Sequence, residues 1–390
     1  MGRAKKIAIG AGLFVGLAAT VFFGFVPGIV ARSKNAVRAN GPWTLEGEAK
    51  QRHDALLVVD MHADSLLWDV DLAENRGWGH VDLPRMRQGG LDLQGFTVVT
   101  KVPAAKTIDK NRSDSDVITA LMFGQLRPPS AWFSLEARAL DQAAALRALD
   151  ESEPDFRLLR TRADLEAFIR DKESNPGLVG GWLGLEGSHA LEGDLQAVDR
   201  LYDAGYRMFA PAHFFDNEVG GSAHGWDKGG LTDFGRQVIQ RQEELGIVLD
   251  LAHASPRVVT DALAIATRPV VVSHTGVKAT CDSARNLSDA QIRGVAATGG
   301  VVAIGFFQNA VCGTTLDDIV AAIMHTVEVV GADHVGFGSD FDGAEAMPFD
   351  ATGMGQLTEA LRARGLSDED VAKIAGGNVV RVLGQTLPTP

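Results

Sequence analysis

The sequence predicts a (β/α)8 barrel, an α/β fold in which eight parallel strands alternate with helices. Eight short apolar runs occur along the chain, with helical patterns between them. Most of these runs are continuous rather than alternating, as expected of parallel strands that are buried on both faces. Polar side chains with metal-binding chemistry follow several of the runs directly. The predicted strands are residues 56–62, 95–100, 179–186, 206–212, 247–253, 269–274, 299–306 and 334–340.

An open, doubly wound sheet is the alternative arrangement of the same elements. Such a sheet gathers its site at one switch point, whereas a closed barrel brings all of its strand ends to one mouth. The polar residues follow the first, third, fourth, fifth, sixth and eighth predicted strands. This wide distribution favours the barrel.

The first 35 residues predict a membrane anchor. No charged residue occurs from Ile7 to Ala31, and a bilayer-spanning helix needs about 20 apolar residues. Basic residues flank the run on both sides, so charge alone does not set its orientation. A basic start before an apolar run is also typical of export signals. Because the run is long for a cleaved signal, we expect an uncleaved transmembrane helix and a catalytic domain in the periplasm or outside the cell.

The rest of the chain predicts a linker and one catalytic domain. Residues 36–53 are polar and mixed, which favours a linker with a short helix, and residues 54–390 contain all eight predicted strands. Residues 103–136 form a long insertion after the second strand. In a barrel this insertion would lie on the active-site face and shape substrate access.

Helix boundaries between the strands carry recognisable signals. Thr161 and Asp164 have the spacing of a capping box. Residues 233–245 have a helical pattern that ends at Gly246, a typical helix stop. Ser288 is placed to open the helix that follows the sixth strand.

The composition excludes one class of partner. The net charge is −13, and the chain has no basic stripe or RNA-binding motif, which argues against nucleic-acid binding. The chain has two cysteines, Cys281 and Cys312. Their spacing leaves open whether they form a disulfide in an oxidising compartment or remain two buried thiols.

Candidate metal ligands follow the first and third strands. His62 and Asp64 are two residues apart, so strand alternation directs both side chains to the same side, where they can chelate one metal. A lone His-x-Asp pattern is a weak signal. Glu186 follows the third strand and precedes a glycine turn, and its two oxygens suit it to bridge two cations. A salt bridge inside the barrel is the alternative role for Glu186.

Two histidines follow the fifth and sixth strands at matched positions. They are His253 and His274, and neutral imidazole is a good ligand for zinc. The alternative is a pair of hydrogen-bonded core histidines. Matched placement beside His62 at the first strand favours the metal-binding role.

Three further residues are candidates for catalysis and substrate binding. Asp340 follows the eighth strand, where it could ligate a metal and transfer the proton of a metal-bound water. His213 follows the fourth strand and is a candidate to stabilise an oxyanion. Arg285 follows the sixth strand and could grip a substrate carboxylate with two hydrogen bonds. Residue type alone leaves structural roles open for His213 and Arg285. The residues expected to be structural or on the surface are His189, His224, His325, His334 and Asp342.

In this order and combination, these segments resemble the membrane dipeptidase (renal dipeptidase) family of binuclear zinc peptidases. The resemblance covers about residues 54 to 384. Its segments are Asp60–Asp64 (DMHAD), Leu185–His189 (LEGSH), Gly229–Gly235 (GGLTDFG), Asp250–His253 (DLAH), Ser273–His274 (SH), Ala284–Leu287 (ARNL), Gly338–Gly343 (GSDFDG) and Gly377–Val382 (GNVVRV).

The resemblance implies a (β/α)8 barrel that holds two zinc ions. By the family pattern, His62 and Asp64 hold one zinc. His253 and His274 hold the other, and Glu186 bridges the two ions.

The resemblance also implies the roles of the remaining site residues. Asp340 lies beside the metals and handles the proton, while His213 and Arg285 contact the substrate. Family members hydrolyse dipeptides, often accept a D-residue at the C-terminal position, and in some cases open β-lactam rings; dimers are common among them. Mammalian members have a disulfide in the region of Cys281 and Cys312, which implies a disulfide here.

This chain departs from the family pattern in two places. Ser188 stands where glycine is frequent, which would change the turn after Glu186 slightly. The predicted anchor is N-terminal, whereas mammalian members carry a C-terminal lipid anchor.

We therefore expect a membrane-anchored zinc dipeptidase in which a hydroxide bridging the two metals attacks the peptide carbonyl. Arg285 would hold the free C-terminal carboxylate of the dipeptide. The first alternative is another metal-dependent amidohydrolase, acting on a cyclic amide, lactam or lactone. Such enzymes usually begin with His-x-His at the first strand, where this chain has His62-Ala63-Asp64. The second alternative is a non-catalytic, membrane-tethered binding protein, which should have lost a ligand, whereas all six candidate positions are filled.

Overall fold

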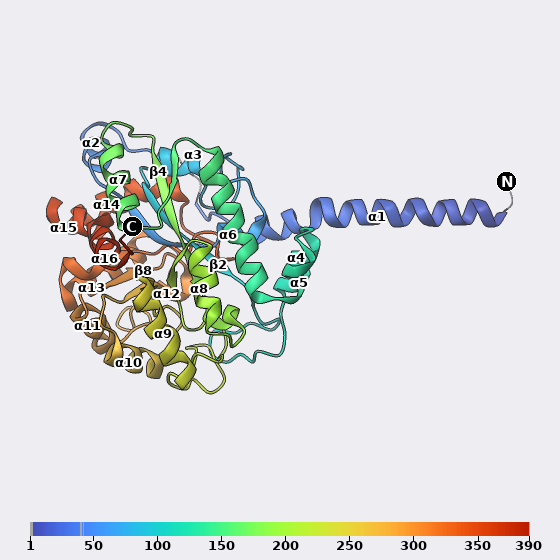
Figure 1. Ribbon diagram of the computed structural model, residues 1–390. Coiled ribbons are helices and arrows are strands. Elements are labelled where there is room, and N and C mark those ends of the chain that lie inside the picture. The colour runs from blue at the N-terminus through green and yellow to red at the C-terminus, as the bar shows by residue number, and fades with distance from the viewer. Residues whose placement is uncertain (1–2, 40, 42, 390) are drawn as a thin grey trace.

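A curved sheet of parallel strands forms the centre of the molecule, and helices surround it (Figure 1). The computed structural model describes residues 3–39, 41 and 43–389, with side chains described from residue 19 onward. The sheet positions the site, because every strand on its main path runs in the same direction and places its C-terminal end at the same mouth.

Within the described residues the sheet has nine strands, eight of which follow one path in the order β6-β5-β4-β2-β1-β9-β8-β7. The two ends of this path are joined by a parallel bridge between Asp250 and Val271. Strand order thus follows the chain around a ring, which is consistent with a TIM-like barrel. The strands are β1 (Val59–Ala63), β2 (Leu93–Val99), β4 (Val179–Glu186), β5 (Tyr206–Phe209), β6 (Val248–Leu249), β7 (Val271–Thr275), β8 (Val301–Ile304) and β9 (Val335–Phe337).

All eight predicted strands are present and overlap their predicted ranges. A further strand, β3 (Phe156–Leu158), was not predicted. Among the described residues it pairs with β4 alone, off the main path. Its three residues, of which the middle one is exposed, are too few to give a clear apolar run.

The predicted helix boundaries are confirmed. Thr161 and Asp164 form a capping box at the start of α7 (Arg162–Lys172). Ser288 forms another at the start of α11 (Asp289–Ala297), and α9 (Asp233–Leu245) ends at Gly246. Further helices of the body are α2 (Gly47–Asp54), α3 (Leu83–Gly89), α6 (Leu135–Ser152), α8 (Gln196–Asp203), α10 (Pro256–Ile265), α12 (Gln308–Val311), α13 (Leu316–Val330), α14 (Met354–Ala363), α15 (Asp368–Ala372) and α16 (Asn378–Thr386).

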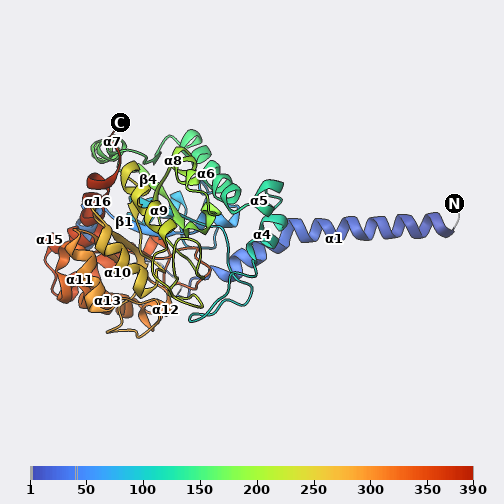
Figure 2. The ribbon, with the colours of Figure 1, turned by 60° about the horizontal axis from the view of Figure 1, so that its bottom comes forward.

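The first helix, α1 (Arg3–Lys34), projects from the body, and α4 (Ile118–Gly124) and α5 (Pro129–Phe133) lie beside its base (Figures 1 and 2). Ala31 anchors this base in an apolar cluster with Ile118 and Met122. No helix in the part of the chain that the structure describes combines the length and apolarity needed to cross a bilayer. The predicted anchor falls partly on residues 7–18, whose side chains lie outside the described set.

Cys281 and Cys312 form a disulfide with a Cα–Cα distance of 5.2 Å. The pairing implied by the family resemblance is therefore confirmed. The loop that it closes contains Arg285, one of the predicted substrate contacts.

Candidate metal centre and active site

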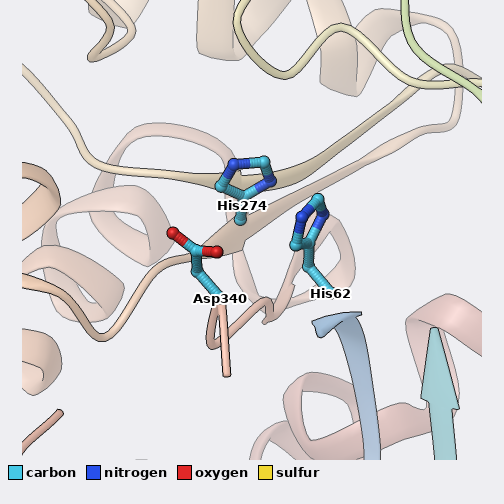
Figure 3. A group of neighbouring side chains, drawn as sticks. All are labelled: His62, His274 and Asp340. Atoms are coloured by element: carbon cyan, nitrogen blue, oxygen red, sulfur yellow. The ribbon is translucent and has the colours of Figure 1, made fainter. Parts of the chain in front are cut away.

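The C-terminal ends of the strands bring the six predicted metal-site residues together in a buried cluster. His62 and His274 lie on β1 and β7, and Glu186 is the last residue of β4. The other three follow strands closely. Figure 3 shows His62, His274 and Asp340 directed toward one another. The six residues, all at most 8% exposed, are His62, Asp64, Glu186, His253, His274 and Asp340.

One carboxylate oxygen, Oε1 of Glu186, lies at the centre of this cluster. The Nε2 atoms of His62, His253 and His274 lie 3.3, 3.0 and 3.4 Å from it. Asp64 Oδ1 lies 3.5 Å from His62 Nε2. In a tetrahedral zinc site with bonds of about 2.0–2.1 Å, neighbouring donor atoms lie about 3.3 Å apart. The separations therefore fit donors that share metal ions.

A serine hydroxyl orients two of the imidazoles. Ser273 Oγ lies 2.9 Å from His62 Nδ1 and 3.0 Å from His274 Nδ1. A hydroxyl oxygen can accept hydrogen bonds from both rings. With both Nδ1 atoms protonated, both Nε2 atoms carry lone pairs that face the cluster, and His62 Nε2 has no hydrogen-bond partner among the described residues.

Another histidine, His224, orients the imidazole of His253. His224 Nδ1 lies 2.6 Å from the carbonyl oxygen of Ile108, and its Nε2 lies 2.9 Å from His253 Nδ1. Because a carbonyl only accepts, His224 carries its proton on Nδ1 and accepts from His253 at Nε2. This arrangement leaves Nε2 of His253 free to bind a metal.

The sequence had placed His224 among the structural or surface histidines. The structure shows it buried and in contact with His253. It lies in a loop rather than at a strand end, so the pattern that marks the other site histidines is absent.

Two of the cluster residues have unusual backbone conformations. His253 and Asp340 have φ angles of 60° and 66°, in the left-handed region that non-glycine residues rarely adopt. Such conformations cost about 1–3 kcal/mol and are concentrated at functional sites. Gly338 lies two residues before Asp340, and an added Cβ at this position would lie 1.8 Å from the carbonyl oxygen of Ser273. The backbone is therefore shaped closely around these side chains.

His253 and His274 are held in the neutral form that binds metals. Burial lowers the pKa values of His253 and His274 well below the ordinary value, and the nearby charge of Arg285 adds to the effect. Burial likewise lowers the pKa of His213 well below its ordinary value.

The carboxylates repel one another in the absence of a compensating charge. Burial, together with the nearby charge of Asp64, raises the pKa of Glu186 to about 7 and that of Asp340 well above its ordinary value. Burial alone would lower the pKa of His62, yet Glu186 and Asp64 raise it well above its ordinary value. Bound divalent cations would relieve this repulsion. The charges of the cluster therefore fit a metal site.

The cluster opens into a cavity of about 540 Å³. Asp64, Glu186, His253 and Asp340 line its inner end. The predicted insertion forms much of the wall, with residues from Pro103 to Leu121, so its expected position beside the site is confirmed. The helix α1 also contributes, through Val30 and Lys34.

The two predicted substrate contacts, His213 and Arg285, line the same cavity. His213 Nε2 lies 3.5 Å from Glu186 Oε2. Arg285 Nη2 donates to the carbonyl oxygen of His274 at 2.8 Å, and its guanidinium lies over Phe307. Neither His213 Nδ1 nor Arg285 Nε has a hydrogen-bond partner among the described residues. Each residue therefore has a buried polar atom whose hydrogen-bonding capacity is unused among the described residues.

The other residues expected to be structural have partners away from the metal cluster. Asp342 accepts hydrogen bonds from Ser65 and Arg76. Burial would raise its pKa, but His80 and Arg76 lower it well below the ordinary range. The remaining contacts are His189 with Thr100, His325 with Asp289, and His334 with the carbonyl of Gly300.

Known proteins resemble the chain over most of its length. The family model for membrane dipeptidase (peptidase family M19) matches residues 47–388. An uncharacterized dipeptidase of Schizosaccharomyces pombe is 33% identical over 372 residues, which cover 89% of this chain and 87% of that protein.

Two solved structures resemble both the sequence and the fold. Dipeptidase AC, a metallopeptidase of family M19, is 26% identical with a TM-score of 0.70, and the match covers 85% of this chain and 99% of that one. A metallopeptidase from Rhodobacter sphaeroides, liganded with a phosphinate mimic of the dipeptide L-Ala-D-Ala, is 27% identical with a TM-score of 0.69 and the same coverage. The chain therefore belongs to the membrane dipeptidase family, peptidase family M19, and is a hydrolase that acts on peptide bonds.

Proposed function

We propose that the protein is a zinc-dependent dipeptidase that accepts dipeptides with a C-terminal D-residue. One observation carries this proposal: three imidazole nitrogens surround Glu186 in a buried cluster, and the guanidinium of Arg285 lines the same cavity. The dipeptide mimic in the R. sphaeroides metallopeptidase contains a C-terminal D-alanine, which supports acceptance of a C-terminal D-residue.

The proposed metal site uses five ligands from four strand ends. His62 and Asp64 would hold one zinc, and His253 and His274 the other. Glu186, whose Oε1 lies within 3.4 Å of Nε2 in three of these histidines, would bridge them. Two bound zinc ions would supply a water of lowered pKa and polarise the peptide carbonyl.

Three side chains would then act on the substrate. Asp340 would accept the proton of the attacking water and deliver it to the leaving amine, since its buried carboxylate is available at the cavity. His213 would donate a hydrogen bond to the oxyanion of the tetrahedral intermediate. Arg285 would bind the C-terminal carboxylate. A fixed cation close to the cluster limits the distance between the scissile bond and the C-terminus, which would restrict substrates to dipeptides.

We also propose that residues 7–31 tether the protein to a membrane, with the catalytic domain in the periplasm or outside the cell. The absence of charge in this segment and the basic residues on both sides of it support the tether. The disulfide between Cys281 and Cys312 supports an oxidising compartment.

Hydrolysis of a defined peptide panel by the full chain in detergent tests the catalytic proposal. The full chain is needed because Val30 and Lys34 of α1 line the cavity. The panel contains L-L and L-D dipeptides, the same dipeptides with an amidated C-terminus, tripeptides, and a cyclic amide and a lactone. Released amines are measured with ninhydrin, and opening of the cyclic amide and the lactone by chromatography.

We expect cleavage of free dipeptides that a chelator abolishes and added zinc restores. Amidated dipeptides and tripeptides should be poor substrates, because Arg285 would have no carboxylate within reach. Protein shown to hold two metals per chain that opened the cyclic substrates but cleaved no dipeptide would overturn the proposal.

A further inference from the structure

Exposed apolar side chains are concentrated in one region of the surface. In the part of the chain with described side chains, eleven large hydrophobic residues are exposed, and ten of them lie on α1 or on the insertion that carries α4 and α5. The eleventh, Trp226, lies under the cations of Lys110 and Arg112. The ten residues, named here the apolar face, are Val21, Phe22, Phe25, Val26, Ile29, Val30, Val117, Phe123, Leu126 and Phe133.

The apolar face is continuous between the two elements. The ring of Phe123 on α4 lies 6.5 and 5.3 Å from the rings of Phe22 and Phe23 on α1. Gly124 allows the close approach of the helices, because an added Cβ would lie 3.3 Å from Pro27 Cγ. In both views α4 and α5 lie beside the base of α1 (Figures 1 and 2).

The outer end of the apolar face is strongly exposed. Phe133 and Leu126 are 84% and 65% exposed, and neither is needed to fill the core beneath. Single exposed hydrophobic residues are normal, but a contiguous group of this kind marks a surface that contacts another apolar phase.

We propose that the apolar face contacts a lipid bilayer, with α4 and α5 dipping into its interface beside α1. Continuity favours lipid over a protein partner, because the same helix leads back into a segment with no charge from Ile7 to Ala31. Charge favours it as well. The exposed Arg32 and Lys34 follow this segment directly in a chain of net charge −13, as expected beside anionic headgroups.

The contact would place the catalytic cavity at the membrane surface. Val30 and Lys34 of α1 line the cavity, as do Val117, Ile118 and Leu121 of the insertion. The elements that carry the apolar face therefore also form one wall of the cavity. The inference rests on the proposed tether to bring the body to the bilayer, but it concerns a second contact, made by the insertion.

A fluorescent label on the insertion tests this contact. Both native cysteines are in the disulfide, and the described residues include no free cysteine, so a single introduced cysteine can be labelled selectively. Phe133→Cys carries an environment-sensitive nitrobenzoxadiazole label in the full chain, reconstituted into phosphatidylcholine vesicles with or without phosphatidylglycerol. The matched control is Glu369→Cys on α15, which lies at the opposite end of the body from α4 and α5 (Figures 1 and 2).

We expect the label at position 133 to emit at shorter wavelength than the label at 369 and to be quenched by nitroxide-bearing lipids. Phosphatidylglycerol should increase the quenching. Protein that floats with the vesicles while the label at 133 remains unquenched would overturn the inference and leave the tether intact. A shifted emission without nitroxide quenching would overturn it too, because a second copy of the chain would then cover the face. Dipeptide hydrolysis in the same samples tests the proposed function separately.

Discussion

Replacing His224 by phenylalanine should weaken metal binding although His224 is not itself a proposed ligand. Its Nε2 accepts from His253 Nδ1 at 2.9 Å, and its Nδ1 donates to the carbonyl oxygen of Ile108. Phenylalanine keeps a ring of similar shape but leaves the buried N–H of His253 without an acceptor. An unsatisfied buried donor costs about 1–3 kcal/mol. Losing the partner of a metal-binding histidine typically lowers metal affinity by about 10–100-fold, which is roughly 1.4–2.7 kcal/mol.

The assay is a competition titration of the full chain with a chelator of known zinc affinity, at fixed pH. His224→Phe should lose about 10–100-fold in affinity for one of the two zinc ions, and His224→Gln, which retains an acceptor, should lose less. His53→Phe is the matched control. It removes a buried histidine with two hydrogen bonds, to Thr358 and Gly89, that does not line the cavity. A His224→Phe protein with wild-type affinity for both zinc ions would refute the orienting role.

Four further predictions follow from the site and its disulfide. Asp340→Asn should lower kcat by about 10²–10⁴-fold while mass spectrometry still finds wild-type metal content; near-normal turnover would exclude the proton-transfer role. Arg285→Met should raise KM for dipeptides by about 10–100-fold, because it removes hydrogen bonds between charged groups, with little change for amidated dipeptides; equal losses on both substrates would contradict the carboxylate grip. Zinc affinity should fall by up to about tenfold per pH unit as the pH drops below 7, because the pKa of Glu186 is about 7 without metal and only the carboxylate binds; chelator competition at several pH values checks this, and an affinity that does not change with pH would contradict it. Replacing Cys281 and Cys312 by serine should lower the free energy of unfolding by about 3–4 kcal/mol, the value expected for a loop with a sequence separation of 31 residues; a midpoint of urea unfolding equal to that of the wild type would show that the loop is held in another way.

The sequence was most informative where local patterns determine structure. Strand ends could be located because continuous apolar runs end in polar residues, and each of the six candidate ligands follows such a run. His224 could not be found in this way. Its loop is held by hydrogen bonds to the side chain of Asp216, including those from the backbone N–H groups of Ser222 and Asp227. Such contacts, like the bond to Ile108, depend on the folded path of two distant loops.

The part of the apolar face that lies on the insertion was likewise beyond reach of the sequence. The insertion showed its polar residues more clearly than its apolar ones, and Phe123 or Phe133 would be read as core residues in isolation. Only the packing of α4 against α1 shows that these side chains are left exposed. The strand β3 escaped prediction for a different reason, since three residues give too short a pattern.

The barrel closes between β6 and β7, where few backbone hydrogen bonds join the two strands, and this closure lies beside the metal cluster. β6 and β7 are joined by one bridge, and Leu251 N–H donates to the carbonyl oxygen of Val271. Close to this contact between β6 and β7, Nε2 of His253 and Nε2 of His274 lie 2.9 Å apart. A metal ion bound by both His253 and His274 would link the strand β6 to the strand β7 and so help to close the barrel. Metal binding would then stabilise the closed ring of strands as well as supply the chemistry, so metal removal would lower the stability of the barrel.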